Sequence, residues 1–170
     1  WTDSANMCLN ATVQVAFSSG VTDSSAESGV FMYECTSLTT PVKDCTSIAI
    51  SPTLANNTLL KIVDGSFGAT ASVLKPNKAY RVVLTTDIMS VPQVASGGGK
   101  TQIPLVSTVT KAQKDGVLDG FVGDPAYYFE FTTGEDYCSL VSAYIDPSEN
   151  TVTVLGPLMS QYSKENPFYY

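Results

Sequence analysis

The fold of this chain is decided by Leu74-Lys75-Pro76-Asn77-Lys78-Ala79-Tyr80-Arg81-Val82-Val83-Leu84-Thr85. Here a leucine is followed by a turn that contains proline, and Tyr80 then opens a run rich in β-branched and apolar residues. Such a run, bounded by a turn, is typical of a strand. We therefore expect a tight turn followed by a strand from Tyr80 to Thr86.

Outward from this stretch, the sequence alternates with a period of two. Val13, Val15 and Phe17 alternate with polar or small residues, which predicts a half-buried strand. Glycine, proline, asparagine and serine separate further short segments of this kind, and no segment has the pattern of a long amphipathic helix. An all-β sandwich or barrel is therefore predicted. The expected strands are residues 12–17, 30–35, 45–50, 58–63, 69–74, 80–86, 127–133, 141–145 and 151–155.

One connection is too long for a compact domain. The segment from Asp87 to Ala126 would join two well-defined strands, and a connection of that length needs structure of its own. We expect residues 103–110 and 116–122 to pair as an inserted ribbon. The glycine-rich segment 96–99 before it is typical of a flexible hinge.

Cysteines and glycosylation sequons indicate an oxidising secretory route. There is no CxxC pair and no histidine, so a zinc site is not expected. An even number of cysteines in a chain rich in serine and threonine predicts disulfides. Sequons at Asn10 and Asn56 predict N-linked glycans. We therefore expect a secreted, extracellular or cell-surface protein. The four cysteines are Cys8, Cys35, Cys45 and Cys138.

Composition excludes several classes of partner. Nine basic and sixteen acidic side chains give the 170-residue chain a formal net charge of −7. This charge repels nucleic acid phosphates and anionic membranes. No apolar run is long enough to span a bilayer, so membrane insertion is not expected. The hydrophobic fraction of 44% supplies a sizeable core and argues against disorder.

Catalytic chemistry is not expected either. Without histidine, the common Ser-His and Cys-His arrangements cannot form. The segment 97–101 lacks the glycine spacing of a phosphate-binding loop. Asp115, Asp119 and Asp124 could bind calcium, but they do not match an EF-hand loop and are better explained as solvated carboxylates. We expect no metal, no cofactor and no enzymatic activity.

Three motifs together resemble a known family. Residues 74–85 have the tyrosine-corner pattern of Greek-key sandwiches, in which the Tyr80 phenol would bond to backbone across the corner. Residues 10–18 followed by Val21 resemble the opening strand, and residues 129–134 the closing strand, of the bacterial immunoglobulin-like domains of S-layer and cell-surface proteins. The resemblance implies an immunoglobulin-like Greek-key sandwich used as a spacer, adhesive or scaffold, with no shared catalytic residues.

The chain departs from that family at both ends. These domains usually begin with an extra edge strand before the position of Asn10, but residues 2–6 are not strand-like. Residues 140–152 resemble that missing strand and its turn, placed after the closing strand instead. The first strand of the sandwich is therefore expected to be missing from its usual place.

Three interpretations of the C-terminal segment remain open. Residues 139–170 could begin the next repeat of a tandem array, fold back on their own domain, or complete a neighbouring subunit by β-strand addition. Strand addition is heterologous, so it would propagate into a filament unless it closed into a ring. The expected interface residues are Leu140, Val141, Ala143, Ile145, Val152, Val154, Phe168, Tyr169 and Tyr170.

The implied topology also suggests a disulfide pairing. Cys35 ends one predicted strand and Cys45 starts the next, so a local bridge is easily formed. Cys8 precedes the first strand and Cys138 follows the closing strand, and these points share one pole of the sandwich. Of the three possible connectivities, we predict Cys35–Cys45 with Cys8–Cys138.

The sequence thus predicts a sandwich over residues 1–138, with an insertion at about 87–126, and a C-terminal strand or tail over 139–170. The leading hypothesis is a secreted glycoprotein subunit that assembles with itself, head to tail, into an extracellular filament or surface layer. The alternative is an adhesive module of a tandem array that binds a glycan, a protein or another surface ligand through the insertion.

Overall fold

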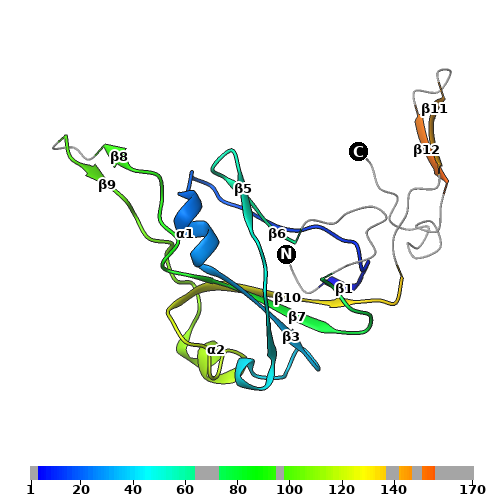
Figure 1. Ribbon diagram of the computed structural model, residues 1–170, viewed down its shortest axis with the longest axis horizontal. Helices are drawn as coiled ribbons and strands as arrows, with labels where there is room; N and C mark the ends of the chain where they lie inside the picture. Colours follow the sequence, from blue (N-terminus) through cyan, green and yellow to red (C-terminus); the bar gives the residue numbers. More distant parts are fainter. Residues whose placement is uncertain (1–3, 64–72, 95–97, 137–141, 147–150, 156–170) are drawn as a thin grey trace.

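Two mostly antiparallel β-sheets form the body of the molecule (Figure 1). The computed structural model describes residues 4–63, 73–94, 98–136, 142–146 and 151–155. The five-stranded sheet has the order β1 (Ser4–Met7), β10 (Pro125–Thr133), β7 (Ala79–Thr85), β3 (Val30–Cys35) and β4 (Thr46–Ile48). The three-stranded sheet has the order β2 (Val13–Ala16), β6 (Leu59–Val63) and β5 (Thr53–Ala55).

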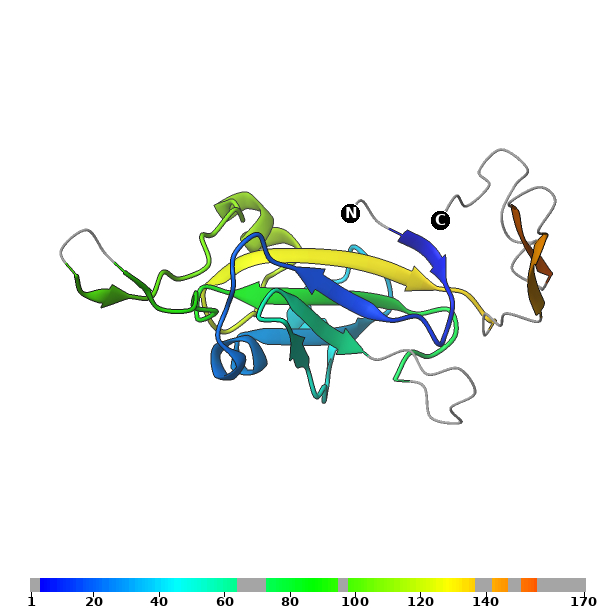
Figure 2. The ribbon, with the colours of Figure 1, turned by 90° about the horizontal axis from the view of Figure 1, so that it is seen from above.

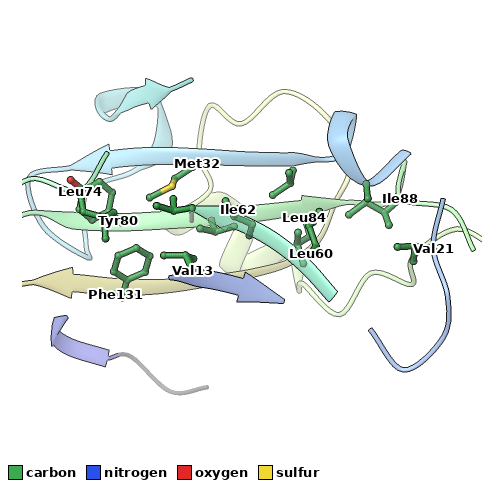
Figure 3. Packing of buried hydrophobic residues seen from close by; sticks show 14 residues of the cluster. Val13, Val21, Met32, Leu60, Ile62, Leu74, Tyr80, Leu84, Ile88 and Phe131 are labelled. Carbon is green, nitrogen blue, oxygen red and sulfur yellow. The ribbon is translucent and has the colours of Figure 1, made fainter. Parts of the chain in front are cut away.

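The two sheets face each other across one apolar core. Val13, Leu60 and Ile62 of the three-stranded sheet belong to the same buried cluster as Met32, Tyr80, Val82, Leu84 and Phe131 of the five-stranded sheet (Figure 3). Alternate residues of each strand point to one face of a sheet, which explains why the apolar residues of β2 and β6 meet those of β7. The prediction of an all-β fold is confirmed.

β7 is the central strand of the five-stranded sheet, and all seven of its residues are buried. Its inner face carries the core residues Tyr80, Val82 and Leu84. Its outer face carries Arg81 and Val83, and Val83 belongs to a second small cluster with Val42 and Leu118. β7 is therefore covered on both faces, which is why its sequence reads as a nearly continuous apolar run.

Most of the predicted strands are present. β3 covers residues 30–35 as expected, and β2, β6, β7 and β10 agree with their predictions to within two residues at either end. β4 is shorter than predicted, and β5 was not predicted because three residues carry too little pattern. The predicted strand at 69–74 falls mostly outside the described residues.

The start of the chain requires a correction. Residues 2–6 are not strand-like in sequence, but residues 4–7 form β1, which pairs in parallel with the end of β10. Ser4 is paired with Phe131 and Met7 with Thr133. Backbone hydrogen bonds to a preformed edge hold this strand, so its polar sequence carried no periodic signal.

The long connection between β7 and β10 also differs from the prediction. Residues 103–110 and 116–122 do not pair as a ribbon. Instead, the helix α2 (Lys111–Gly116) and the segments on either side of it cover the outer face of the five-stranded sheet, where Val109, Val117 and Phe121 pack around Val83 (Figure 1). The apolar residues of this connection thus bury themselves against the sheet rather than against each other.

Several short elements lie outside the two main sheets. β8 (Gln93–Val94) pairs with β9 (Lys100–Thr101) in a short arm that projects from one end of the molecule (Figure 2). The helix α1 (Asp23–Ser28) lies at the same end, where the Ser25 hydroxyl accepts a hydrogen bond from the Met89 amide at 2.9 Å. A single turn of 3-10 helix (Val42–Asp44) precedes β4.

The C-terminal strands β11 (Ser142–Asp146) and β12 (Thr151–Leu155) pair antiparallel with each other. Among the described residues, neither strand pairs with the two sheets of the body. Figure 2 places this hairpin at the end of the molecule opposite the β8–β9 arm. The chain therefore carries a small β-element beyond the pole at which β10 ends.

Candidate functional site

The Cys35–Cys45 disulfide predicted from the sequence is present. It joins the end of β3 to the residue before β4, and these two strands are neighbours in the five-stranded sheet. Cys8 is also held in a disulfide. Cys138 lies outside the described residues, so the pair Cys8–Cys138 stays a prediction.

The two sequons lie at turns. Asn56 is exposed in the turn between β5 and β6, where it and Asn57 adopt left-handed φ angles of 53° and 57°. Asparagine tolerates this conformation better than most residues, and so the pair closes the hairpin. Asn10 is half-buried in the turn that leads from β1 to β2. Glycans on both residues remain a prediction.

Tyr80 occupies the position that the tyrosine-corner pattern predicts. Its ring is fully buried and stacks on Phe131 with the ring centroids 5.2 Å apart. Its phenol oxygen accepts a hydrogen bond from the Lys75 backbone amide at 2.7 Å. Burial raises the pKa of the phenol, because the charged form would lose solvation.

A buried ion pair supports the outer face of the same sheet. Arg81 is 1% exposed and pairs with Glu130 of β10. Its guanidinium also donates to the carbonyls of Leu38, Thr40 and Val117, at 2.7, 2.8 and 2.6 Å. This side chain thus ties the loop before β4 and the long connection to the sheet, and no sequence pattern had marked it.

The predicted assembly residues of the tail are only partly described. Ala143, Ile145, Val152 and Val154 fall in β11 and β12, where the register pairs Ala143 with Val154 and Ile145 with Val152. The four apolar positions therefore lie opposite one another in the hairpin. Leu140, Val141, Phe168, Tyr169 and Tyr170 lie outside the described residues.

β2 is an edge strand. It pairs with β6 from Val13 to Ala16, and no strand in the described part of the chain pairs with its other edge. The Phe17 amide donates to the Thr58 carbonyl on the β6 side at 2.7 Å. Because the backbone groups of a strand alternate between its two edges, the amides of Gln14 and Ala16 face the open edge.

Next to this edge, the side chains on the inner face of β10 become more exposed from Phe131 back to Tyr127. Tyr127, Phe129 and Phe131 oppose the core residues Leu84, Val82 and Tyr80 of β7, so all three share the inner face. Phe131 is 2% exposed, Phe129 is half-buried and Tyr127 is 40% exposed. β1 pairs with β10 only at Phe131 and Thr133, so it reaches only the end of that strand.

The opposite side of the body is closed by the chain itself. β4 leads directly into β5 through residues 49–52, so this segment crosses from the five-stranded to the three-stranded sheet. Ile50, at its middle, packs against the core. Between its two poles, no described segment crosses the side formed by β2 and β10. The link from β1 to β2 lies at the pole where β10 ends (Figure 2). At the other pole, the Ser107 hydroxyl and the Thr108 amide donate to carbonyls at the start of β10, and Leu105 packs against the core. We refer to the side between β2 and the Tyr127–Phe129 part of β10 as the open seam.

The carboxylates singled out in the sequence do not gather into a site. Asp119 forms an ion pair with Lys43, which raises the pKa of that lysine. Asp115 and Asp124 are exposed. In the parts of the chain that the structure describes, no three acidic, cysteine or histidine residues are grouped so as to hold a metal ion. No described helix has the length and apolar character required to cross a membrane.

Comparison with protein-family models, with curated proteins and with solved structures finds no match for this chain.

Proposed function

We propose that this chain is an extracellular structural subunit that assembles with copies of itself, head to tail, by β-strand addition. The observation that carries the proposal is the hairpin β11–β12, which pairs with neither sheet of the body among the described residues. The body also has the open seam, whose edge and apolar residues a donated strand would cover.

The strand order supports an immunoglobulin-like Greek-key fold for the body. In that fold one sheet has the order A-B-E-D and the other contains C, F and G. The order β2-β6-β5 corresponds to B-E-D, and β3, β7 and β10 correspond to C, F and G. No described strand occupies the place of strand A beside β2. The buried Tyr80, bonded to Lys75, supports the same assignment.

The disulfide and the sequons support an extracellular location. Structural disulfides persist mainly in oxidising compartments, and Cys35–Cys45 is such a bridge. Glycans on Asn10 and Asn56 would add to this support. Their presence is checked by intact-mass measurement before and after enzymatic deglycosylation, and an unchanged mass would count against the secretory route.

Assembly is tested by deleting residues 139–170. The full chain should form polymers visible by electron microscopy and by light scattering, whereas the truncated chain should stay monomeric and be less stable. Adding the deleted segment back as a peptide should restore part of the stability, because buried aliphatic side chains contribute roughly 1.5 to 3 kcal/mol each. A full chain that stays monomeric at high concentration would overturn the proposal, and so would a truncated chain that polymerises.

A matched pair of substitutions separates strand addition from other uses of the tail. Val152 is one of the apolar positions of the hairpin, and Thr153 is its neighbour on the alternate position. Val152→Asp should abolish polymerisation, since a buried carboxylate without a partner is strongly unfavourable. Thr153→Asp should leave polymerisation intact. Equal effects of the two substitutions would argue that the alternation does not matter.

A second candidate function rests on the long connection. Five of the six exposed large apolar residues in the described chain fall in the region from Val94 to Tyr127. Scattered apolar residues are normal on surfaces, but a group confined to one region favours a binding surface. If this chain is an adhesive module, Val122→Ser with Val106→Ser should weaken attachment to its surface ligand without changing the polymerisation described above.

A further inference from the structure

We propose that the edge of β2 is the acceptor for this assembly, and that β11 of a second copy of the chain adds there antiparallel to β2. This inference rests on the proposed head-to-tail assembly and specifies where and in which direction it occurs. The occupant is a second copy rather than an unrelated partner, because the chain itself supplies a β-element that is joined to neither sheet among the described residues.

The edge of β2 is the edge best placed to accept a strand. Each of the two sheets ends in two edge strands, β1 and β4 in one and β2 and β5 in the other. The edges at β4 and β5 belong to the side that residues 49–52 close. The edge of β2 belongs to the open seam, and it presents the amides of Gln14 and Ala16, both of which have exposed side chains.

A row of partly exposed apolar side chains lies where an added strand would cover it. Val15 and Phe17 of the β2 region and Phe129 of β10 pack against the core but are only half-buried. Tyr127 continues their surface on the inner face of β10 and is 40% exposed. A strand placed beside β2 would lie over this row, so its apolar residues would complete the core while its backbone paired with β2.

The directions of the strands fit an antiparallel addition to β2. The arrows of β2 and β10 point in opposite directions (Figures 2 and 3), so a strand antiparallel to β2 runs in the direction of β10. The tail leaves the body at the end of β10 and carries the hairpin beyond that pole. Suppose that a second copy follows the first in the same orientation. The tail of the first copy then reaches the second copy at the pole that carries the β8–β9 arm. From there the tail runs in the direction of β10, which is antiparallel to β2 of the second copy. A strand that folded back directly from the end of β10 onto its own β2 would instead run parallel to it.

A contact of this kind propagates from copy to copy. The donated element lies at one pole and the acceptor is entered from the other, so each copy uses two different surfaces. Contacts of this heterologous kind produce open filaments when successive copies share one orientation.

The acceptor is tested by photo-cross-linking in the full chain. A benzophenone amino acid is placed at Gln14 on β2, and matched variants carry it at Thr53 on β5 and at Ser47 on β4, all three positions being exposed. Each variant is polymerised with isotope-labelled wild-type chain, irradiated and analysed by mass spectrometry. Position 14 should capture residues 142–155 of the labelled chain roughly tenfold more than the other two positions, as expected for a paired strand.

The outcomes separate this inference from the proposed function. Polymer that cross-links from position 53 or 47, but not from position 14, overturns the acceptor and leaves assembly by strand addition standing. A cross-link from position 14 to the tail of the same chain shows that the tail completes its own domain, and it overturns both. Absence of any polymer overturns the proposed function itself, and the inference with it.

A pair of substitutions tests the edge independently. Ala16→Pro removes the amide that faces the open edge, and proline is accepted on an edge strand when its ring faces solvent. It should reduce polymer formation by roughly a hundredfold, while the melting temperature changes little, because the pairing of β2 with β6 does not use this amide. Ala16→Val keeps the amide and should polymerise normally. Normal polymerisation of a folded Ala16→Pro chain would overturn the acceptor, and if that variant does not fold, the cross-links decide.

Discussion

At the scale of single residues, the polar groups of the core are satisfied by specific partners. In the described chain, no buried side-chain nitrogen or oxygen atom is left without a hydrogen bond. Tyr80 and Arg81 are consecutive buried residues of β7, and their polar groups find hydrogen-bond partners on opposite faces of the sheet. Tyr80 directs its hydroxyl to a backbone amide, and Arg81 directs its charge to Glu130 and three carbonyls. Each arrangement leads to a measurable consequence.

Tyr80→Phe should destabilise the fold by about 1 to 3 kcal/mol, because the Lys75 amide loses the phenol oxygen as its acceptor. The measurement is denaturant unfolding of the two proteins at neutral pH. The variant should still fold, since the ring keeps its stacking on Phe131. An unchanged free energy of unfolding would mean that water replaces the phenol without cost.

The same residue should make stability depend on alkaline pH. Burial raises the pKa of Tyr80 in the folded state, so between the ordinary value of about 10 and the raised value only the unfolded chain ionises. The stability contributed by the neutral phenol is therefore complete below about pH 10 and is lost as the pH rises further. Tyr80→Phe should show a smaller loss between pH 9 and 11. The remaining dependence is expected from Tyr33, whose pKa is also raised by burial.

Glu130→Ala should cost about 3 to 5 kcal/mol, because it leaves the buried Arg81 guanidinium without its counter-charge. The double variant Arg81→Met with Glu130→Ala should lose less than the sum of the two single variants, which a double-mutant cycle measures. Asp119→Ala is the matched control, since its partner Lys43 is exposed and the pair should matter little to the melting temperature. Additive effects at Arg81 and Glu130 would show that the pair does not act as a unit.

At the scale of elements, short strands are held by covalent and backbone links that compensate for their length. β4 has three residues and is joined to β3 by the Cys35–Cys45 disulfide. β1 has four residues and pairs with β10 at two positions. Strands this short bury little apolar surface of their own, so their stability depends on the sheet that they join.

Replacing Cys35 and Cys45 together by alanine should destabilise the protein by about 2 to 3 kcal/mol, since the bridge closes a loop of sequence separation 10. The fold should persist, because Arg81 still holds the carbonyls of Leu38 and Thr40 within that loop. Hydrogen exchange should quicken in residues 36–48 and remain slow in β7. Loss of protection across both sheets would show that the bridge supports the whole body rather than one hairpin.

At the scale of the whole molecule, charge opposes the proposed association. Each copy carries a formal net charge of −7, so copies that approach end to end repel one another. Raising the ionic strength from about 0.02 M to about 0.5 M should therefore speed polymerisation, by roughly tenfold, as the repulsion is screened. Time-resolved light scattering measures the rate. Slower assembly at high salt would indicate that attractive ion pairs, rather than apolar burial, dominate the contact.

The sequence by itself determined the strands that have a strong pattern. Burial on one face produces the alternation of apolar and polar residues in β2, β3, β6 and β10, and burial on both faces produces the apolar run of β7. Because burial selects apolar residue types, these strands can be recognised from the sequence. The turn before Tyr80 and the local Cys35–Cys45 bridge were also predictable, because both depend on residues close together in the chain.

Only the tertiary structure decided the features that depend on distant backbone. β1 and β5 arise from edges that other strands provide, and Arg81 reaches carbonyls 36 to 43 residues away. The long connection was predicted as a ribbon, but its apolar residues pack on the outer face of the sheet, a surface that no local pattern reveals. The Thr110–Gln113 capping box was a local signal that could have identified α2. The open seam has the same origin, since an edge lacks a partner only by virtue of how all the strands are ordered.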